Sequence, residues 1–346
     1  MATCCECGNA SGRSSMREVR SRRRAQGLAT AVLALLTAGL PCRAQLPVAD
    51  HYSGMCEASA AVALDAQHFV VADDESNALR IYRRGASAPA GPPVELAAFL
   101  GTGDKASDLE GAALIGDVVY WISSHSLTSA GNNREWRRRL FATRADLPSS
   151  RPTVQPVGAP YVRLLEDLVD ADERWSLGLA RATQTPPEQA GGLNIEGLAA
   201  TPDGGLLIGF RNPLKGRKAV VVPIQNPSAM MEGKKATFGV PALLDLGDRG
   251  IRSIERIATG YLIVAGPISN NGDFALYAWS GAPAEAAKPI RVALPPKFTP
   301  EALFVLPGTR EALLLSDDGA LLVGGKTCEK PDKSQQRFRA TNITVQ

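Results

Sequence analysis

Five glutamates recur at comparable places along the sequence. Each opens a short stretch of small or apolar residues, followed by a turn, an apolar run and a polar cluster. They are Glu57, Glu110, Glu196, Glu255 and Glu301. Carboxylates that meet repel each other, and a hard cation such as Ca²⁺, which takes about six to eight oxygen ligands, relieves that repulsion. The pattern predicts a shared carboxylate site with calcium as its ion, unless these are ordinary exposed glutamates at strand starts.

Three further side chains could act on a ligand. His125 and Arg211 each follow an apolar run in the second and third units, and Arg252 lies in the fourth. A guanidinium binds phosphate or carboxylate, and an imidazole carries protons near neutral pH. We therefore expect Arg211 and Arg252 to bind an anion and His125 to act as general acid or base. Acidic pairs at 73–74 and 317–318 end the corresponding runs of two other units, where a simple turn is the alternative.

The repeating units indicate how these residues are positioned. The glutamates are 46 to 86 residues apart, and each unit contains short apolar runs bounded by turn residues. Repeats of about 40 to 50 residues built from short strands are typical of β-propellers. We therefore predict an all-β fold, a five-bladed β-propeller. The first strand of each blade lines the central channel, which would bring the five carboxylates to one axis.

Two parts of the chain depart from the regular repeat. The widest interval separates Glu110 from Glu196, and its residues 161–182 predict a helix, so we expect a decorated loop and helix insertion between blades two and three. In the last unit, residues 321–323 are the expected third strand and 338–345 the fourth. With that assignment no strand is shared between the first and last blades, and ring closure needs another device.

The N-terminal region predicts export. Arginines precede an apolar run over 28–40, and Cys42-Arg43-Ala44 follows, which together indicate a signal peptide over 1–44 and a single propeller domain over 45–346. The run is shorter than the roughly 20 residues that span a bilayer. Met16 lies just ahead of the arginines and is a candidate for the true start. The expected location is periplasmic or secreted, with either the general or the twin-arginine route open.

Two cysteines, Cys56 and Cys328, lie outside the predicted leader. Export to an oxidising compartment favours a disulfide between them, and two separate buried thiols are the alternative. This bond would join the beginning and the end of the propeller.

The net charge of the predicted domain limits the kinds of partner that we expect it to bind. Residues 45–346 carry 31 basic and 33 acidic side chains, so the domain is nearly neutral. A general nucleic-acid partner is therefore not expected. We expect a monomer without a membrane span that takes a small anionic ligand or substrate.

Several motifs resemble those of the bacterial domain of unknown function 3616 family. They are DLEGA at 108–112, YWISSHS at 120–126, NIEGL at 194–198, GFRNP at 209–213, GIRSIE at 250–255 and PEAL at 300–303. The resemblance extends over residues 57–325 and implies an exported propeller without an established activity. More distantly, NIEGL is similar to the esterase-like phytase family. The layout of one glutamate per blade also resembles calcium-dependent apyrases, which are five-bladed propellers with an axial calcium.

These observations leave functions of different classes open. One is a calcium-dependent hydrolase of phosphate esters or similar anions, a phosphatase-, phytase- or nucleotidase-like enzyme. The alternative is a non-catalytic ligand- or protein-binding propeller whose ion is structural. Glycoside hydrolysis by paired carboxylates is a third possibility. Phosphate release with calcium and with chelator would separate the first from the others.

Overall fold

The computed structural model describes residues 49–146, 152–330 and 332–345. The predicted signal peptide over 1–44 and the candidate start at Met16 lie outside these residues. In the described part of the chain, no helix combines the length and the apolar character that a membrane crossing requires.

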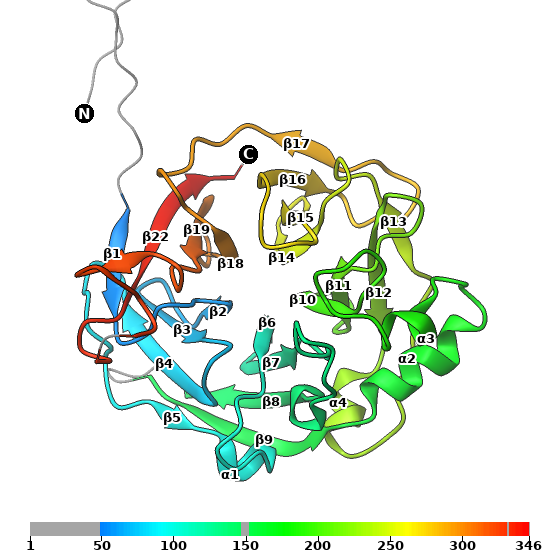
Figure 1. Ribbon diagram of the computed structural model, residues 1–346, viewed down its shortest axis with the longest axis horizontal. Coiled ribbons are helices and arrows are strands. Elements are labelled where there is room, and N and C mark those ends of the chain that lie inside the picture. Colours follow the sequence, from blue (N-terminus) through cyan, green and yellow to red (C-terminus); the bar gives the residue numbers. More distant parts are fainter. Residues whose placement is uncertain (1–48, 147–151, 331, 346) are drawn as a thin grey trace, which may run out of the picture. The chain divides into compact units, whose positions relative to one another are not determined.

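Five four-stranded antiparallel sheets surround a central axis, which confirms the predicted five-bladed β-propeller (Figure 1). From the axis outwards, the strands of blade one are β2 (Ala60–Ala63), β3 (His68–Ala72), β4 (Ala78–Arg83) and β5 (Val94–Glu95). Those of blade two are β6 (Leu109–Ile115), β7 (Val118–Ser123), β8 (Leu140–Ala145) and β9 (Val154–Tyr161). Those of blade three are β10 (Asn194–Ala200), β11 (Leu206–Asn212), β12 (Ala219–Ile224) and β13 (Ala242–Leu244). Those of blade four are β14 (Gly250–Ile257), β15 (Gly260–Gly266), β16 (Ala275–Trp279) and β17 (Lys288–Ile290).

Blade five combines strands from the two ends of the domain. Its strands are β18 (Pro300–Val305), β19 (Glu311–Ser316), β22 (Arg337–Thr344) and, outermost, β1 (Asp50–Ser53). β1 pairs with β22 from Asp50 opposite Ala340 to Ser53 opposite Arg337. The prediction that no strand closes the ring is therefore wrong, because the segment before blade one completes the last blade.

The predicted third strand of the last unit is also corrected. Residues 321–323 contribute only β20 (Leu322–Val323), which pairs with β21 (Lys326–Thr327) in a separate hairpin. Leu322 is 70% exposed, whereas Phe338 of β22 is fully buried. The third place in the sheet goes to the strand whose aromatic side chain packs into the core.

Aromatic rings reinforce the junction of blades five and one. Tyr52 of β1 meets Phe69 edge-on with ring centroids 5.1 Å apart and stacks on Phe338 at 5.4 Å. Phe69 in turn stacks on Phe304 at 5.0 Å. Such pairs add stability beyond their buried area, so this contact supports the closure made by β1.

The predicted insertion between blades two and three is helical. The helices of the domain are α1 (Ala97–Leu100), α2 (Leu164–Asp172), α3 (Leu179–Ala182), α4 (Pro227–Met231) and the 3₁₀ turn η1 (Glu135–Arg137). Leu164, Leu165 and Leu168 of α2 pack into the core shared by blades two and three. This apolar face explains why α2, within the predicted helical segment 161–182, forms a helix against the propeller rim.

The structure forms the predicted disulfide between Cys56 and Cys328. Two backbone hydrogen bonds lie beside the disulfide. The Asp318 amide donates to the Cys56 carbonyl at 3.0 Å, and the Cys328 amide donates to the Gly319 carbonyl at 3.0 Å. The disulfide therefore joins the segment before Glu57 to the segment after β19.

Candidate functional site

The inner strands of blades two to five carry a β-bulge at one common level. The strand pairing shifts by one residue between Leu109 and Gly111, and at the matching place in the other three blades. The four extra residues are Glu110, Glu196, Arg252 and Glu301. A bulge redirects the side chain of its extra residue. All four line one cavity of about 410 Å³, called the axial cavity below.

Close packing between neighbouring inner strands surrounds the β-bulges. A Cβ added to Gly197, directly after Glu196, would lie 2.8 Å from the Ile251 Cγ2 atom of the next blade. A Cβ on Gly111 would similarly lie 3.0 Å from the Cβ of Leu198. The glycine of the Glu-Gly motif therefore lets neighbouring inner strands approach closely while the glutamate faces the axis.

Glu57 joins the axial cavity by a different route. It pairs with Asp317 through an isolated bridge, next to the disulfide at Cys56. A Cβ on Gly319 would come within 1.9 Å of the Glu57 Oε1 atom, so the chain turns tightly around this carboxylate. Four of the five glutamates singled out in the sequence, Glu57, Glu110, Glu196 and Glu301, thus line one cavity.

Glu255 lies elsewhere. It is three residues beyond the bulge of β14 and lines a different cavity at the other end of the inner strands. Arg252 occupies the equivalent position in blade four, so the placement of Glu255 in the ring is corrected. Blade four has Ile-Arg-Ser-Ile where blade two has Leu-Glu-Gly-Ala, and an alignment on glutamate alone selects the wrong residue.

One side of the axial cavity is an arginine–glutamate network. The Arg252 Nε atom lies 2.9 Å from Glu196 Oε2, and its guanidinium also pairs with Glu301. Arg211, at the end of β11, pairs with Glu196 Oε1 at 2.8 Å and donates to the Ser269 carbonyl at 2.9 Å. Arg211, Arg252, Glu196 and Glu301 are all buried. These charges neutralise one another and hold blades three, four and five together.

The pKa values of the two arginines shift in opposite directions. Burial lowers the pKa of Arg252, although Glu196 opposes this effect. Burial also disfavours the charge of Arg211, but the attraction of Glu196 outweighs it, so the pKa of Arg211 is raised. Both guanidinium groups nevertheless stay protonated at physiological pH, as arginine does in proteins.

The other side of the axial cavity is acidic. Two groups of carboxylates each have one oxygen per residue within 4.8 Å of the others: Glu57 with Asp74 and Glu75, and Asp74 with Asp108 and Glu110. Asp74 belongs to both groups, and its buried Oδ1 atom has no hydrogen-bond partner among the described residues. The only ion pair within 4.0 Å that this cluster makes in the described chain is between Arg137 and Asp108, at 3.0 Å.

Burial, together with this crowding, raises carboxyl pKa values. Burial, followed by repulsion from Asp74 and Asp317, raises the pKa of Glu57 to about 11. Burial first and neighbouring carboxylates second hold the pKa of Asp74 and of Glu110 well above the ordinary range. Either protons or a cation must therefore balance the charge, and carboxylate oxygens are ligands that Ca²⁺ prefers.

His125 is not among the residues that line the axial cavity. It is 2% exposed, and its Nδ1 atom lies 2.7 Å from the carbonyl of Ser123, on the strand that it follows. Burial lowers its pKa to about 4, and its Nε2 atom has no hydrogen-bond partner in the described chain. Ser126 and Arg137 of the following loop reach the cavity instead.

Sequence reasoning missed part of the lining. Asp108, Asn194 and Thr299 each lie two residues before a glutamate of the bulge level, and all three line the axial cavity. A polar residue two positions before Glu in the repeated motif is the signal that could have identified them. Asp74 and Asp317 were visible as polar clusters, but the sequence equally allowed simple turns. Arg137 ends the short 3₁₀ turn η1 between β7 and β8 and has no counterpart in the repeat.

Comparison with a family model covers the middle of the domain. Residues 163–310 match the family described as a protein of unknown function, DUF3616. The match runs from α2 into blade five, and it supports the resemblance of the quoted motifs in this range. None of the curated proteins compared with the chain matches it.

Solved propeller structures are distantly similar. A putative glucose dehydrogenase-type oxidoreductase from Thermus thermophilus has 12% identity and a TM-score of 0.43, and the match covers 86% of this chain and 100% of that one. The β-propeller domain of Cps50 (Swd1) from Myceliophteria thermophila has 9% identity and a TM-score of 0.38, with 86% and 100% covered. An engineered GH43 glycoside hydrolase has 10% identity and a TM-score of 0.42, with 86% and 52% covered.

Proposed function

We propose that the axial cavity binds a divalent cation, Ca²⁺, and with it a small anionic ligand of the phosphate-ester class. The observation that carries this proposal is the presence of an acidic cluster and two buried arginines in one cavity. Glu57, Asp74 and Asp108 lie on the first side, and Arg211 and Arg252 on the second.

The charge balance supports binding of the cation before the anion. Ten carboxyl groups but only three guanidinium groups line the cavity in the described part of the chain. Such a surface repels a free phosphate ester. A bound cation would replace this repulsion with a local attraction for the anion. Its charge would add to that of Arg211, which lines the same cavity. The ligand is therefore expected to bind only when the metal is present.

The residues fit a calcium ion. Asp74 supplies a buried carboxylate oxygen without a partner, and Glu57, Asp108 and Glu110 supply further oxygens nearby. Calcium tolerates irregular cages of oxygen ligands, which suits carboxylates that come from different blades. When bound, the ion would supply positive charge that polarises an oxygen of the ligand.

Hydrolysis of the ligand is a second candidate function. It is favoured by Glu57 and Asp74, whose high pKa values allow a carboxyl group to hold a proton in the cavity. His125, the proton carrier expected from the sequence, does not line this space. The simpler binding function is favoured because it does not require a proton carrier in the cavity.

We also infer export to an oxidising compartment, periplasmic or extracellular. The disulfide between Cys56 and Cys328 supports this inference, because such bonds persist mainly outside the cytosol. Calcium is also abundant outside the cell, which agrees with the proposed ion.

Calorimetric titration of chelator-treated protein with CaCl₂ and MgCl₂ tests the cation. We expect calcium binding that weakens at least about tenfold in Glu110→Gln, since calcium affinity depends on the number of charged ligands. Glu285→Gln removes an exposed glutamate and is the matched control. Equal calcium binding by Glu110→Gln and wild type would show that calcium does not bind at Glu110 in the axial cavity.

Titration with p-nitrophenyl phosphate and inorganic phosphate, with and without calcium, tests the anion. We expect binding only with calcium, and its loss in Arg211→Gln but not in Arg217→Gln, which changes an exposed arginine. Release of nitrophenol that requires calcium would establish the hydrolytic function. Binding without release would establish the binding function, and phosphate binding equal in the two variants would exclude Arg211 from the ligand site.

A further inference from the structure

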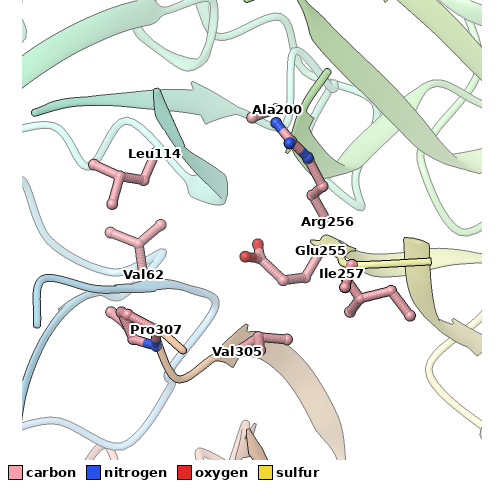
Figure 2. Close-up of a pocket in the computed structure, with 10 residues that line it drawn as sticks. Val62, Leu114, Ala200, Glu255, Arg256, Ile257, Val305 and Pro307 are labelled. Atoms are coloured by element: carbon pink, nitrogen blue, oxygen red, sulfur yellow. The ribbon is translucent and has the colours of Figure 1, made fainter. Parts of the chain in front are cut away.

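The opposite ends of the inner strands enclose a second cavity, called the apolar cavity below. It has a volume of about 320 Å³ and is lined by residues from all five blades. Its apolar lining residues include Val62, Leu114, Ala200, Ile257, Val305 and Pro307 (Figure 2). This volume lies near the lower end of the range of small-molecule pockets.

A single carboxylate faces this apolar surface. Figure 2 shows the Glu255 carboxylate directed toward the middle of the cavity, on the side where Val62 lies. Within the described ranges, no hydrogen bond or ion pair reaches its carboxylate oxygens. Burial raises the pKa of Glu255 to about 8, with Arg256 acting weakly in the other direction. The carboxylate is thus an acceptor without a partner among the described residues, and most of the side chains around it are apolar.

Arg256 does not neutralise it. It is the one other charged residue among the described residues that line the cavity. Figure 2 shows its guanidinium directed toward Ala200, away from the Glu255 carboxylate, and its Nη1 atom donates to the Thr201 carbonyl at 3.3 Å. β2, β6, β10 and β18 contribute only apolar side chains, so no second titratable group from these strands faces Glu255.

We propose that the apolar cavity binds a small primary ammonium compound with a short apolar body, with Glu255 as the residue that accepts its charge. The ammonium would donate to the carboxylate, and the hydrocarbon part would contact Val62, Leu114 and Val305. A metal ion does not fit, because one carboxylate among apolar walls supplies too few oxygens. An anion does not fit either, because Glu255 would repel it once ionised.

The site is independent of the axial cavity. The two share no lining residue, and Glu255 is separated from Arg252 by two residues of β14. The proposal therefore stands whether or not calcium binds at the other end.

Calorimetric titration with n-butylammonium at about pH 9 tests the proposal, because the amine is still protonated there and Glu255 is ionised. We expect a saturable site that weakens at least about tenfold in Glu255→Gln, the usual consequence of losing a charged hydrogen bond. Glu285→Gln keeps the site and matches the charge change. Arg256→Gln should bind the amine more tightly, because a nearby positive charge is removed. n-Butanol and butyrate test the need for the positive charge, and neither should bind.

Several outcomes would overturn the proposal. Equal binding by wild type and Glu255→Gln would exclude Glu255 as the acceptor. Loss of binding in Glu110→Gln with retention in Glu255→Gln would place the amine in the axial cavity. Butyrate binding as tight as that of n-butylammonium would show that the cavity selects only apolar volume. A titration at neutral pH in buffers of different ionisation enthalpy should also show proton release, which must disappear in Glu255→Gln.

Discussion

The two ends of the inner strands differ in whether their charged side chains have ion-pair partners. At the axial cavity, Glu196 and Glu301 are buried and paired with Arg252, and Arg211 also pairs with Glu196. At the apolar cavity, Glu255 lies among mostly apolar side chains without a partner among the described residues. The paired charges at the axial cavity help to hold the blades together. The charge of Glu255 forms no ion pair among the described residues, so its removal should not weaken the fold.

The largest effect should come from Arg252→Ala. It leaves Glu196 and Glu301 buried beside each other without their shared cation, and breaking a buried pair in this way costs about 3–5 kcal/mol. Chemical denaturation in the absence of calcium measures the loss. Arg256→Ala, at the other end of the same strand, should change the free energy of unfolding by less than about 1 kcal/mol. Similar losses in both variants would abolish the contrast between the two ends.

Removal of the disulfide should have the next largest effect. The double change Cys56→Ser and Cys328→Ser should reduce the free energy of unfolding by about 2–4 kcal/mol, the typical contribution of a disulfide that constrains the unfolded chain. The disulfide adjoins Glu57, so calcium affinity should fall as well, while n-butylammonium affinity should not. Denaturation and the two titrations check this, and a parallel loss of both ligands would indicate damage to the whole ring.

Calcium itself should stabilise the fold through the axial cavity. At a free concentration one hundred times the Kd, ligand linkage predicts a gain of about 2.7 kcal/mol. The melting temperature should rise with calcium in wild type and in Glu255→Gln, and should rise much less in Glu110→Gln. A rise of equal size in all three proteins would place the ion outside the axial cavity.

The smallest effect concerns the pH dependence of Glu255. Its pKa rises from an ordinary 4.5 to about 8 on folding, so the folded state binds more protons between these values and stability falls as pH increases through them. Glu255→Gln should remove this decline and be more stable than wild type by about 1–3 kcal/mol near pH 9, allowing for water in the cavity. Denaturation at a series of pH values measures it, and parallel profiles would contradict the raised pKa.

The sequence predicted the features that depend on local pattern. Short apolar runs identified the five blades, and the leucines of 161–182 identified the helical insertion. The Glu-Gly and Glu-Ala motifs singled out Glu110, Glu196 and Glu301, which line one cavity. These features repeat along the chain, so each unit supports the interpretation of the others.

Features that depend on distant pairing or on a single exception were not predictable. Arg252 stands where the other blades have glutamate, and only strand register distinguishes it from Glu255. The four residues of β1, Asp-His-Tyr-Ser, lack an apolar run, so nothing local identifies them as a strand of blade five. The backbone of His125 adopts a positive φ of 58°, which the sequence did not indicate.

The position of β1 also determines when folding can finish. This strand is the first described element of the chain, yet its partner is β22, the last. The most non-local pairing of the domain must therefore form late, after every other blade strand is available, and topologies dominated by such contacts fold slowly. Until then β22 offers an open sheet edge to other chains. The interval before ring closure is consequently the period in which this protein is most exposed to misassembly.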